Sequence, residues 1–337
     1  MLLETISKLE ENSQPLRFCE IRDPSPAQEE ILIRVSACGV CHTELDEIEG
    51  RTTPHFPVVP GHQVVGTVTA LGENAGRFKH GERVGVAWIF SACGTCKFCR
   101  SGNENLCPEF RATGRDVNGG YAELMTVHQD YAFPLPEMFT DAEAAPLLCA
   151  GAIGYRSLRL SGITDGQNLG LTGFGASAHL VLKMVRHKYP HVKVFVFARS
   201  EREREFAKEL GAIWAGDTTN TSLQKLDAII DTTPAWMPIV EALKNLEPGG
   251  RLVINAIRKE EVDKEILLGL SYPEHLWLEK EIKSVANVAR IDVSGFLKLA
   301  ADMHIKPEVE EYTLQEANRA LVELKSAKIR GAKVLRM

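Results

Sequence analysis

Residues 167–178 read QNLGLTGFGASA, and this stretch decides the fold of the second half of the chain. QNLGLT has the apolar run of a strand buried on both faces, and a helical pattern begins at Ala176. Between them stands G-x-G-x-x-A, in which the first glycine makes a turn, the second admits a pyrophosphate and the small third residue packs helix on strand. The stretch therefore predicts a dinucleotide-binding turn, whose candidate contact residues are Gly173, Phe174, Gly175, Ala176 and Ser177.

Strand and helix patterns alternate around this turn. Helical segments at 176–189, 200–212 and 237–246 separate the apolar strand segments, which are 192–198, 226–233 and 251–256. Such alternation specifies a parallel sheet with helices on both faces. Alone the glycine motif is a weak signal, but inside a strand–helix–strand unit it predicts a Rossmann dinucleotide-binding domain, which we place at residues 151–286.

The end of the next strand bears on the choice of nicotinamide coenzyme. NAD is usually held by an acidic residue about 20 residues beyond the motif. Ala198 stands there, followed by Arg199 and Ser200, whose guanidinium and hydroxyl suit a 2′-phosphate. We therefore expect NADP to be preferred. The alternative is that Arg199 faces solvent and NAD is used.

The first half of the chain has a different pattern. Short alternating segments, punctuated by Gly, Pro and Asn, lie at 29–37, 64–71, 82–88 and 121–127. They predict a β-rich, barrel-like domain over residues 1–150. Thr140 and Glu143 have capping-box spacing and predict a helix running to Leu160. The tail, 287–337, is expected to add a helix capped at Thr313 and a last strand that returns to the first domain.

Composition limits the class of protein. With 337 residues, 44% hydrophobic and 25% charged, the chain is long enough for two globular domains. A net charge of −6 argues against nucleic acid or an anionic membrane as partner. The N-terminal segment lacks the apolar core of a signal peptide, and we expect a cytoplasmic protein. In that reducing compartment its 8 cysteines point to metal binding or catalysis rather than disulfides.

Four cysteines cluster in CGTCKFCRSGNENLC, residues 93–107. The spacing C-x2-C-x2-C-x7-C suits tetrahedral thiolate coordination of zinc by Cys93, Cys96, Cys99 and Cys107. Four thiolates leave no position for water or substrate, so this predicts a structural zinc in a lobe at about residues 91–110. A zinc ribbon that binds nucleic acid is a competing interpretation, but it leaves the negative charge and the glycine turn unexplained.

Cys41, His62 and Cys149 form a dispersed group of possible zinc ligands. Two thiolates and one imidazole would leave a fourth zinc position open, as catalytic zinc sites require. Their spacing alone gives little reason to group them. Scattered structural residues are the alternative interpretation.

The order of these motifs resembles the zinc-dependent medium-chain alcohol dehydrogenases. The cysteine knuckle, GVCHTE at 39–44, PGHQ at 60–63, GGYAE at 119–123, CAG at 149–151 and the glycine turn occur in that family's order. The resemblance runs from about residue 15 to the C-terminus. It implies a catalytic zinc held by Cys41, His62 and Cys149, a second structural zinc, and reversible hydride transfer between an alcohol and NADP or NAD.

The resemblance also implies roles for residues near Cys41. Glu44 matches a carboxylate that orients the zinc histidine, although a solvated glutamate on a short helix is the alternative. Thr43 matches a hydroxyl that relays the alcohol proton. His42 matches a position near the pyrophosphate, and a surface histidine is the alternative. Ile48 and Trp88 match walls of the substrate pocket, although Trp88 as an ordinary core residue is the alternative.

Three positions depart from the family pattern. Asp46 stands where a relay histidine is common, which leaves the proton exit open. Gln63 replaces a glutamate beside the zinc histidine, and Ile153 replaces a threonine near the nicotinamide. We expect small or medium primary alcohols and their aldehydes as substrates. The alternatives are a cinnamyl-type aldehyde reductase, a polyol dehydrogenase or, less in keeping with the cysteine–histidine trio, a metal-free reductase. The resemblance further implies a homodimer or homotetramer.

Overall fold

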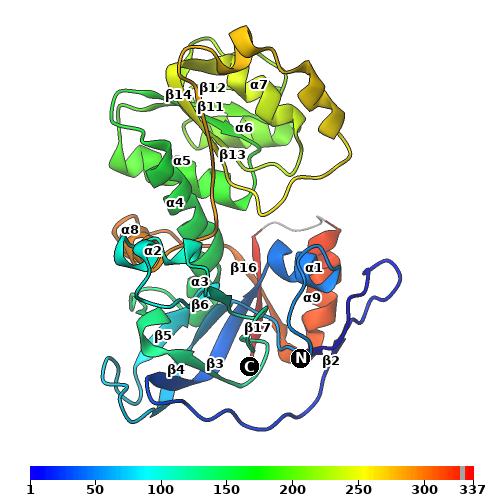
Figure 1. The fold of residues 1–337 in the computed structure, drawn as a ribbon, viewed down its shortest axis with the longest axis vertical. Coiled ribbons are helices and arrows are strands. Elements are labelled where there is room, and N and C mark those ends of the chain that lie inside the picture. Colours follow the sequence, from blue (N-terminus) through cyan, green and yellow to red (C-terminus); the bar gives the residue numbers. More distant parts are fainter. Residues whose placement is uncertain (327–330) are drawn as a thin grey trace. The chain divides into compact units, whose positions relative to one another are not determined.

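The computed structural model describes residues 1–326 and 331–337. The chain divides into two compact units, Met1–Ala152 with Val288–Met337, and Ile153–Asn287. The second is the α/β unit drawn in green and yellow in Figure 1. None of the helices in the described ranges is long and apolar enough to cross a membrane.

The α/β unit is built on a parallel sheet. Its strands, in spatial order, are β12 (Trp214–Gly216), β11 (Lys193–Phe197), β10 (Asn168–Thr172), β13 (Leu226–Asp231), β14 (Leu246–Ile254) and β15 (Glu281–Ser284). Every pairing is parallel. Numbered from β10 along the chain, this order is 3-2-1-4-5-6, the order of a Rossmann fold, so the predicted fold of this half is confirmed.

Helices connect these strands. They are α4 (Ala152–Ser161), which leads into the sheet, α5 (Ala176–Lys188), α6 (Glu201–Glu209) and α7 (Met237–Asn245); short turns η4 (Lys264–Gly269) and η5 (Tyr272–Leu276) follow. The core is apolar on both sheet faces. Phe195, Phe197, Ile229 and Leu252 share one face and pack with Leu243 of α7. The alternate residues, which point to the other face, are also buried: Leu171, Val196, Ile230 and Val253. Continuous apolar strands are what a sheet covered on both faces requires.

The other unit contains an antiparallel sheet with one parallel pair at its edge. Its order is β16 (Val309–Thr313), β17 (Ala332–Arg336), β3 (Glu30–Val40), β4 (Gln63–Leu71), β5 (Arg83–Val86) and β9 (Ala132–Pro134), with β8 (Leu124–His128) also paired to β3. The final strand β17 pairs with β3, so the tail returns to the first domain as predicted. Short pairs β1 (Leu2–Leu3) with β2 (Leu16–Arg17), and β6 (Ile89–Ser91) with β7 (Arg111–Ala112), complete its strands.

The helices of this unit carry several of the candidate residues. They are α1 (His42–Ile48), α2 (Lys97–Arg100), α3 (Asp141–Pro146), α8 (Arg290–Asp302) and α9 (Ala317–Lys325), with short helical turns η1 (Glu104–Leu106), η2 (Gln129–Tyr131) and η6 (Leu314–Glu316). The capping boxes predicted at Thr140 and Thr313 are both formed. A π-helical turn, η3 (Leu147–Gly151), separates α3 from α4, where the sequence predicted one regular helix.

Candidate metal centres and coenzyme turn

Three local structures bring Cys41, His62 and Cys149 together. Cys41 is the N-cap of α1, His62 immediately precedes β4, and Cys149 lies within the π-turn η3. π-Turns occur often at functional sites because the extra residue per turn redirects one side chain. The sulfur of Cys41 lies 3.6 Å from His62 Nε2 and 4.0 Å from the sulfur of Cys149.

These distances fit a shared zinc ion. Zinc–sulfur bonds of about 2.3 Å and zinc–nitrogen bonds of about 2.0 Å at tetrahedral angles place two sulfurs about 3.8 Å apart and sulfur and nitrogen about 3.5 Å apart. The ligand atoms of all three residues lie within 4.8 Å of one another. In the absence of a cation, the adjacent Cys149 thiol and burial raise the pKa of Cys41 well above its ordinary value. A metal would stabilise the thiolate instead, and the trio can hold a zinc ion.

Glu44 fixes the orientation of the candidate zinc histidine. Its Oε1 lies 2.5 Å from His62 Nδ1, and both side chains are buried. Its Oε2 accepts a hydrogen bond of 2.9 Å from the Cys41 amide, which completes a capping box on α1. Burial alone would lower the pKa of His62, but the Glu44 carboxylate and the Cys41 thiol oppose it and raise the pKa overall. The arrangement leaves Nε2 facing the sulfur of Cys41, and the Glu44 carboxylate is buried rather than solvated.

The GGYAE segment supports the loop that carries His62. The amides of Gly119, Gly120 and Tyr121 donate hydrogen bonds of 2.7–2.9 Å to the carbonyls of Val59, Gly61 and Pro60, respectively. Gly61 has a φ of +99°, and a Cβ there would lie 2.3 Å from the Tyr121 ring. A side chain at this position would therefore push the loop away, which explains why this motif accompanies PGHQ.

The four knuckle cysteines also converge. Their sulfurs lie within 4.8 Å of one another, with 3.9 Å between Cys93 and Cys99 and 3.6 Å between Cys96 and Cys99. Hydrogen bonds from the backbone amides of Thr95 and Cys96 are the main reason that the pKa of Cys93 is lowered to about 6. Burial instead raises the pKa of Cys99, to about 12, and that of Cys107. It is therefore the convergence of the four sulfurs that enables this lobe to hold a four-thiolate zinc.

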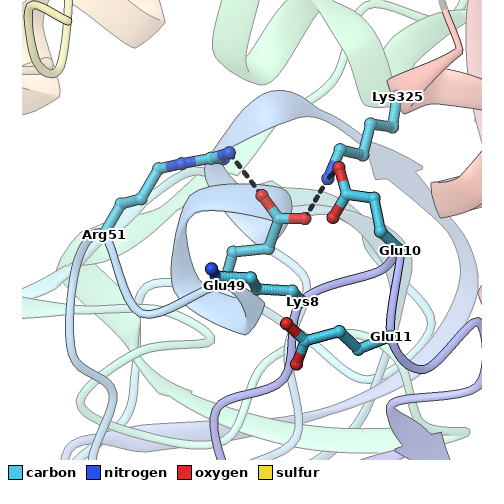
Figure 2. A pocket seen from close by; sticks show the side chains of 6 residues that line it. All are labelled: Lys8, Glu10, Glu11, Glu49, Arg51 and Lys325. Atoms are coloured by element: carbon cyan, nitrogen blue, oxygen red, sulfur yellow. Dashed lines mark hydrogen bonds and ion pairs between the residues drawn. The ribbon is translucent and has the colours of Figure 1, made fainter.

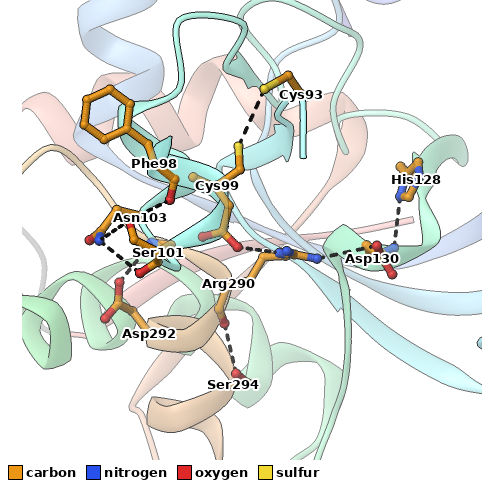
Figure 3. Close-up of polar contacts among 12 residues, drawn as sticks. Cys93, Phe98, Cys99, Ser101, Asn103, His128, Asp130, Arg290, Asp292 and Ser294 are labelled. Atoms are coloured by element: carbon orange, nitrogen blue, oxygen red, sulfur yellow. Dashed lines mark hydrogen bonds and ion pairs between the residues drawn. The ribbon is translucent and has the colours of Figure 1, made fainter. Parts of the chain in front are cut away.

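The knuckle is tied to the C-terminal part of the same unit. Arg290, at the start of α8, donates a 2.8 Å hydrogen bond from Nε to the buried carboxylate of Glu104 in η1. Its guanidinium also lies 3.5 Å from the carboxylate of Asp130 in η2, and Figure 3 shows Arg290 between the knuckle and Asp130. Sequence reasoning missed this link because 186 residues separate Glu104 from Arg290.

The remaining candidates near Cys41 differ in exposure. His42 is exposed, and Thr43 is half-buried with its amide 3.3 Å from the sulfur of Cys41. Asp46 is buried and pairs with Arg51 at 3.0 Å. Ile48 is fully buried at the end of α1.

Two further side chains are relevant to the site around α1. Trp88 is half-buried, with the Arg115 guanidinium 4.9 Å from its ring centre. A second acid on α1, Glu47, was not predicted; it is buried, and burial is the main cause of its raised pKa. A glutamate next to Asp46 gives no sequence signal of burial.

The glycine turn has the geometry that its motif predicts. Gly173 has a φ of +73°, and Gly175 is the N-cap of α5. A Cβ built on Gly175 would meet no described atom within 4 Å, which leaves room for a ligand beside the first turn of the helix. Ala176 is exposed and Ser177 half-buried, while the ring of Phe174 is buried and contacts Phe206. The ring of Phe174 is therefore part of the core, and of this residue only the backbone is a candidate to contact a coenzyme.

The segment after β11 is held by an arginine. Arg199 and Ser200 are exposed. Arg204 Nη1 donates hydrogen bonds of 2.8 Å to the carbonyls of Ala198 and Arg199. Sequence reasoning missed Arg204, which shapes this segment without being part of the motif.

Comparisons with known proteins agree with these features. The family profile of the alcohol dehydrogenase GroES-like domain matches residues 27–137. The chain is 42% identical to "Probable alcohol dehydrogenase AdhA" of Mycobacterium tuberculosis (strain CDC 1551 / Oshkosh), over 95% of this chain and 92% of that protein. It is 30% identical to an alcohol dehydrogenase of Geobacillus stearothermophilus, over 98% of both chains. A cinnamyl alcohol dehydrogenase structure from Sorghum bicolor matches with a TM-score of 0.80 and 28% identity, over 94% of this chain and 92% of that one. The chain belongs to the zinc-dependent medium-chain alcohol dehydrogenase family and is an NAD(P)-dependent alcohol dehydrogenase.

Proposed function

We propose that the protein oxidises small or medium primary alcohols to aldehydes, reversibly, with a catalytic zinc at Cys41, His62 and Cys149 and a structural zinc at the four-cysteine knuckle. The single observation that supports this most is the approach of two sulfurs and one imidazole nitrogen to within 4.8 Å of one another. In this proposal Met1–Ala152 with Val288–Met337 is the catalytic unit, and Ile153–Asn287 binds the coenzyme.

The protein's own groups would prepare the site. When bound, zinc would supply Lewis acidity toward an alcohol oxygen, and the nicotinamide would accept the hydride. Glu44 keeps the proton of His62 on Nδ1, so that Nε2 remains free as a ligand. The Thr43 hydroxyl can both accept and donate a proton, which suits it to take the proton of the alcohol.

Asp46 offers a route for that proton to leave. Its carboxylate accepts a 3.0 Å hydrogen bond from Arg51, which lines a surface pocket of about 560 Å³ together with Glu49 and Lys325 (Figure 2). Arginine stays protonated in proteins, so it cannot itself relay the proton. We propose that Asp46 receives the proton and water removes it, with Arg51 holding the carboxylate in place.

Preference for NADP rests on Arg199 and Ser200. Both are exposed just beyond β11, and Arg204 holds the backbone that presents them. Replacing Arg199 by Ala should raise the KM for NADP far more than the KM for NAD. Equal effects on the two coenzymes would remove this part of the proposal.

The proposed substrate class follows from two side chains and one structural likeness. Ile48 and Trp88 are our candidates for the pocket walls, and the likeness to a cinnamyl alcohol dehydrogenase makes bulky aromatic aldehydes the second candidate class. Activity with a panel of aliphatic, aromatic and polyol substrates, each with NAD and NADP, tests both. Activity on none of them, in protein that contains zinc, would contradict the proposal.

We further propose a homodimer or homotetramer in the cytoplasm, where thiolate ligands stay reduced. β15 lies at the end of the Rossmann sheet, and all four of its residues are exposed. An exposed edge strand offers unpaired backbone groups to a second copy. Sedimentation analysis tests this, and a monomer at micromolar concentration would contradict it.

A further inference from the structure

A buried ion pair lies where the Rossmann sheet changes strand order. Asp231 ends β13 and is fully buried, and its carboxylate lies 2.5 Å from the ammonium of Lys259, which is 8% exposed. The same carboxylate accepts hydrogen bonds of 2.7 Å from the hydroxyls of Thr172 and Thr233. Burying two charges costs desolvation that their attraction barely offsets, so such a pair is weak evidence of a purely stabilising role.

The ammonium of Lys259 has no donor left for a ligand. Besides Asp231, it donates to the carbonyls of Thr233 at 2.7 Å and Ala235 at 3.1 Å. A lysine ammonium has three N–H groups, and these three acceptors use all of them. Lys259 therefore acts on the backbone of the loop after β13 and not on a bound molecule.

The segment around Lys259 holds this loop at further points. The amide of Asn255 donates to the Asp231 carbonyl, and that of Glu260 donates to the Pro234 carbonyl, each at 2.7 Å. The Asp263 carboxylate accepts hydrogen bonds from the amides of residues 236 and 237, at 2.9 and 2.8 Å. Residues 255–263 thus fasten residues 231–237 from end to end, and we call residues 231–237 the clamped loop.

The clamped loop lies against the glycine turn. The amide and hydroxyl of Thr232 donate to the Thr172 carbonyl at 2.9 and 3.0 Å. A Cβ on Gly173 would lie 2.9 Å from a methyl carbon of Thr233. β10 and β13 are the neighbours between which the strand order reverses, and ligands of such sheets bind at the carboxyl ends of the strands at that point.

We propose that Lys259 is a positioning residue for the coenzyme, which with Asp231 and Asp263 keeps the clamped loop in its binding conformation before a dinucleotide arrives. The inference rests on the proposed coenzyme turn at residues 173–178. A loop that is already ordered spares the free energy of ordering it on binding, so the clamp raises affinity without touching the ligand.

Two variants test the proposal. Lys259→Met keeps an unbranched chain of similar length but leaves the Asp231 carboxylate unpaired. The double variant Lys259→Met with Asp231→Asn removes that unpaired charge and protects folding. Arg251→Met is the matched control, because Arg251 pairs with Glu281 at 2.9 Å in the same unit but makes none of the hydrogen bonds that hold the clamped loop.

The measurement is the Kd for NADH and for NADPH, from nucleotide fluorescence, with zinc content and Tm recorded for each protein. Because the three hydrogen bonds from Lys259 to the clamped loop are lost, we expect affinity about ten- to a hundredfold weaker in the double variant. Zinc content should be the same in all variants. Arg251→Met should lower Tm without changing the Kd for either nucleotide. Unchanged affinity in the double variant would overturn the inference, whereas no binding by the unaltered protein would instead overturn the proposed function.

Hydrogen exchange gives a test that needs no variant. In the free protein the amides of residues 233, 236 and 237 donate to the carboxylates of Asp231 and Asp263. They should therefore exchange slowly before NADPH is added and change little afterwards. Rapid exchange that NADPH suppresses would show that the coenzyme orders the loop, and would contradict a clamp formed in advance.

Discussion

Replacing Glu44 by Gln tests the central feature of the proposed zinc site. Glutamine has the shape of glutamate but carries one acceptor and one donor group where the carboxylate has two acceptors. One oxygen of Glu44 lies 2.5 Å from His62 Nδ1, and the other accepts a hydrogen bond from the Cys41 amide. Glutamine can satisfy only one of these donors. If its NH₂ faces His62, the ring proton moves to Nε2, the nitrogen that the metal needs.

The expected size of the effect follows from these contacts. A buried, charge-assisted hydrogen bond contributes about 1.5–3 kcal/mol, and each 1.4 kcal/mol is about a tenfold change in affinity. We therefore expect zinc at this site to bind about ten- to a hundredfold more weakly in Glu44→Gln. Competition with a graded series of chelators measures this affinity, and the knuckle zinc in the same molecule serves as internal reference.

A matched control separates metal binding from helix capping. Glu143 completes the capping box of α3 in the same unit, accepting from the Thr140 amide at 2.9 Å, but it touches no candidate metal ligand. Glu143→Gln should lower Tm slightly and leave both zinc affinities unchanged. If Glu44→Gln also retained the zinc affinity of the unaltered protein, our assignment of Glu44 to the histidine would be refuted.

Three other substitutions have defined outcomes. Gly175→Ala should leave Tm unchanged, because its Cβ meets open space, but weaken NADPH binding by filling the expected pyrophosphate approach; unchanged Kd would argue against the turn. Gly151→Ala places a Cβ 1.9 Å from the Phe296 ring and should destabilise the fold by about 1–3 kcal/mol in urea unfolding, an expectation that an unshifted curve would contradict. The hydrogen bond from Lys333 lowers the pKa of Glu323 in the folded protein below its ordinary value of 4.5. The ionised Glu323 therefore contributes its full stabilisation of the fold above pH 4.5, and this stabilisation is lost as the pH falls through the lowered pKa. Lys333→Met should therefore show less loss of unfolding free energy over that acid range, and an identical pH profile would refute the linkage.

Local patterns predicted much of the fold. The apolar strand, glycine turn and helix at 167–178 placed β10 and α5 to within a residue or two, because each boundary has a local cause. The capping-box spacing at Thr140 and Thr313 likewise predicted where the helical segments α3 and η6 begin. The π-turn η3 was not predictable, because a single inserted residue leaves almost no mark on a helical apolar pattern.

Long-range pairs lay beyond sequence reasoning. Asp231 and Lys259 are 28 residues apart and belong to no periodic pattern, although a charged residue ending an otherwise apolar strand could have drawn notice. Cys41 and Cys149 are 108 residues apart, and only the family resemblance grouped them. The four knuckle cysteines could be grouped from the sequence because they lie within residues 93–107, close enough for a local turn to bring their thiols together.

The return of the C-terminal tail to β3 affects how the protein is made. The α/β unit is one continuous stretch, Ile153–Asn287, and all of it leaves the ribosome before the tail does. The other unit cannot complete its sheet until β17 (Ala332–Arg336), which pairs with β3, has been synthesised. Domains tend to fold as units during synthesis. Strands β3 to β5 are thus made before the α/β unit but complete their sheet after it. Glu104, beside the knuckle cysteines, is likewise made 186 residues ahead of Arg290, the residue of α8 that pairs with it.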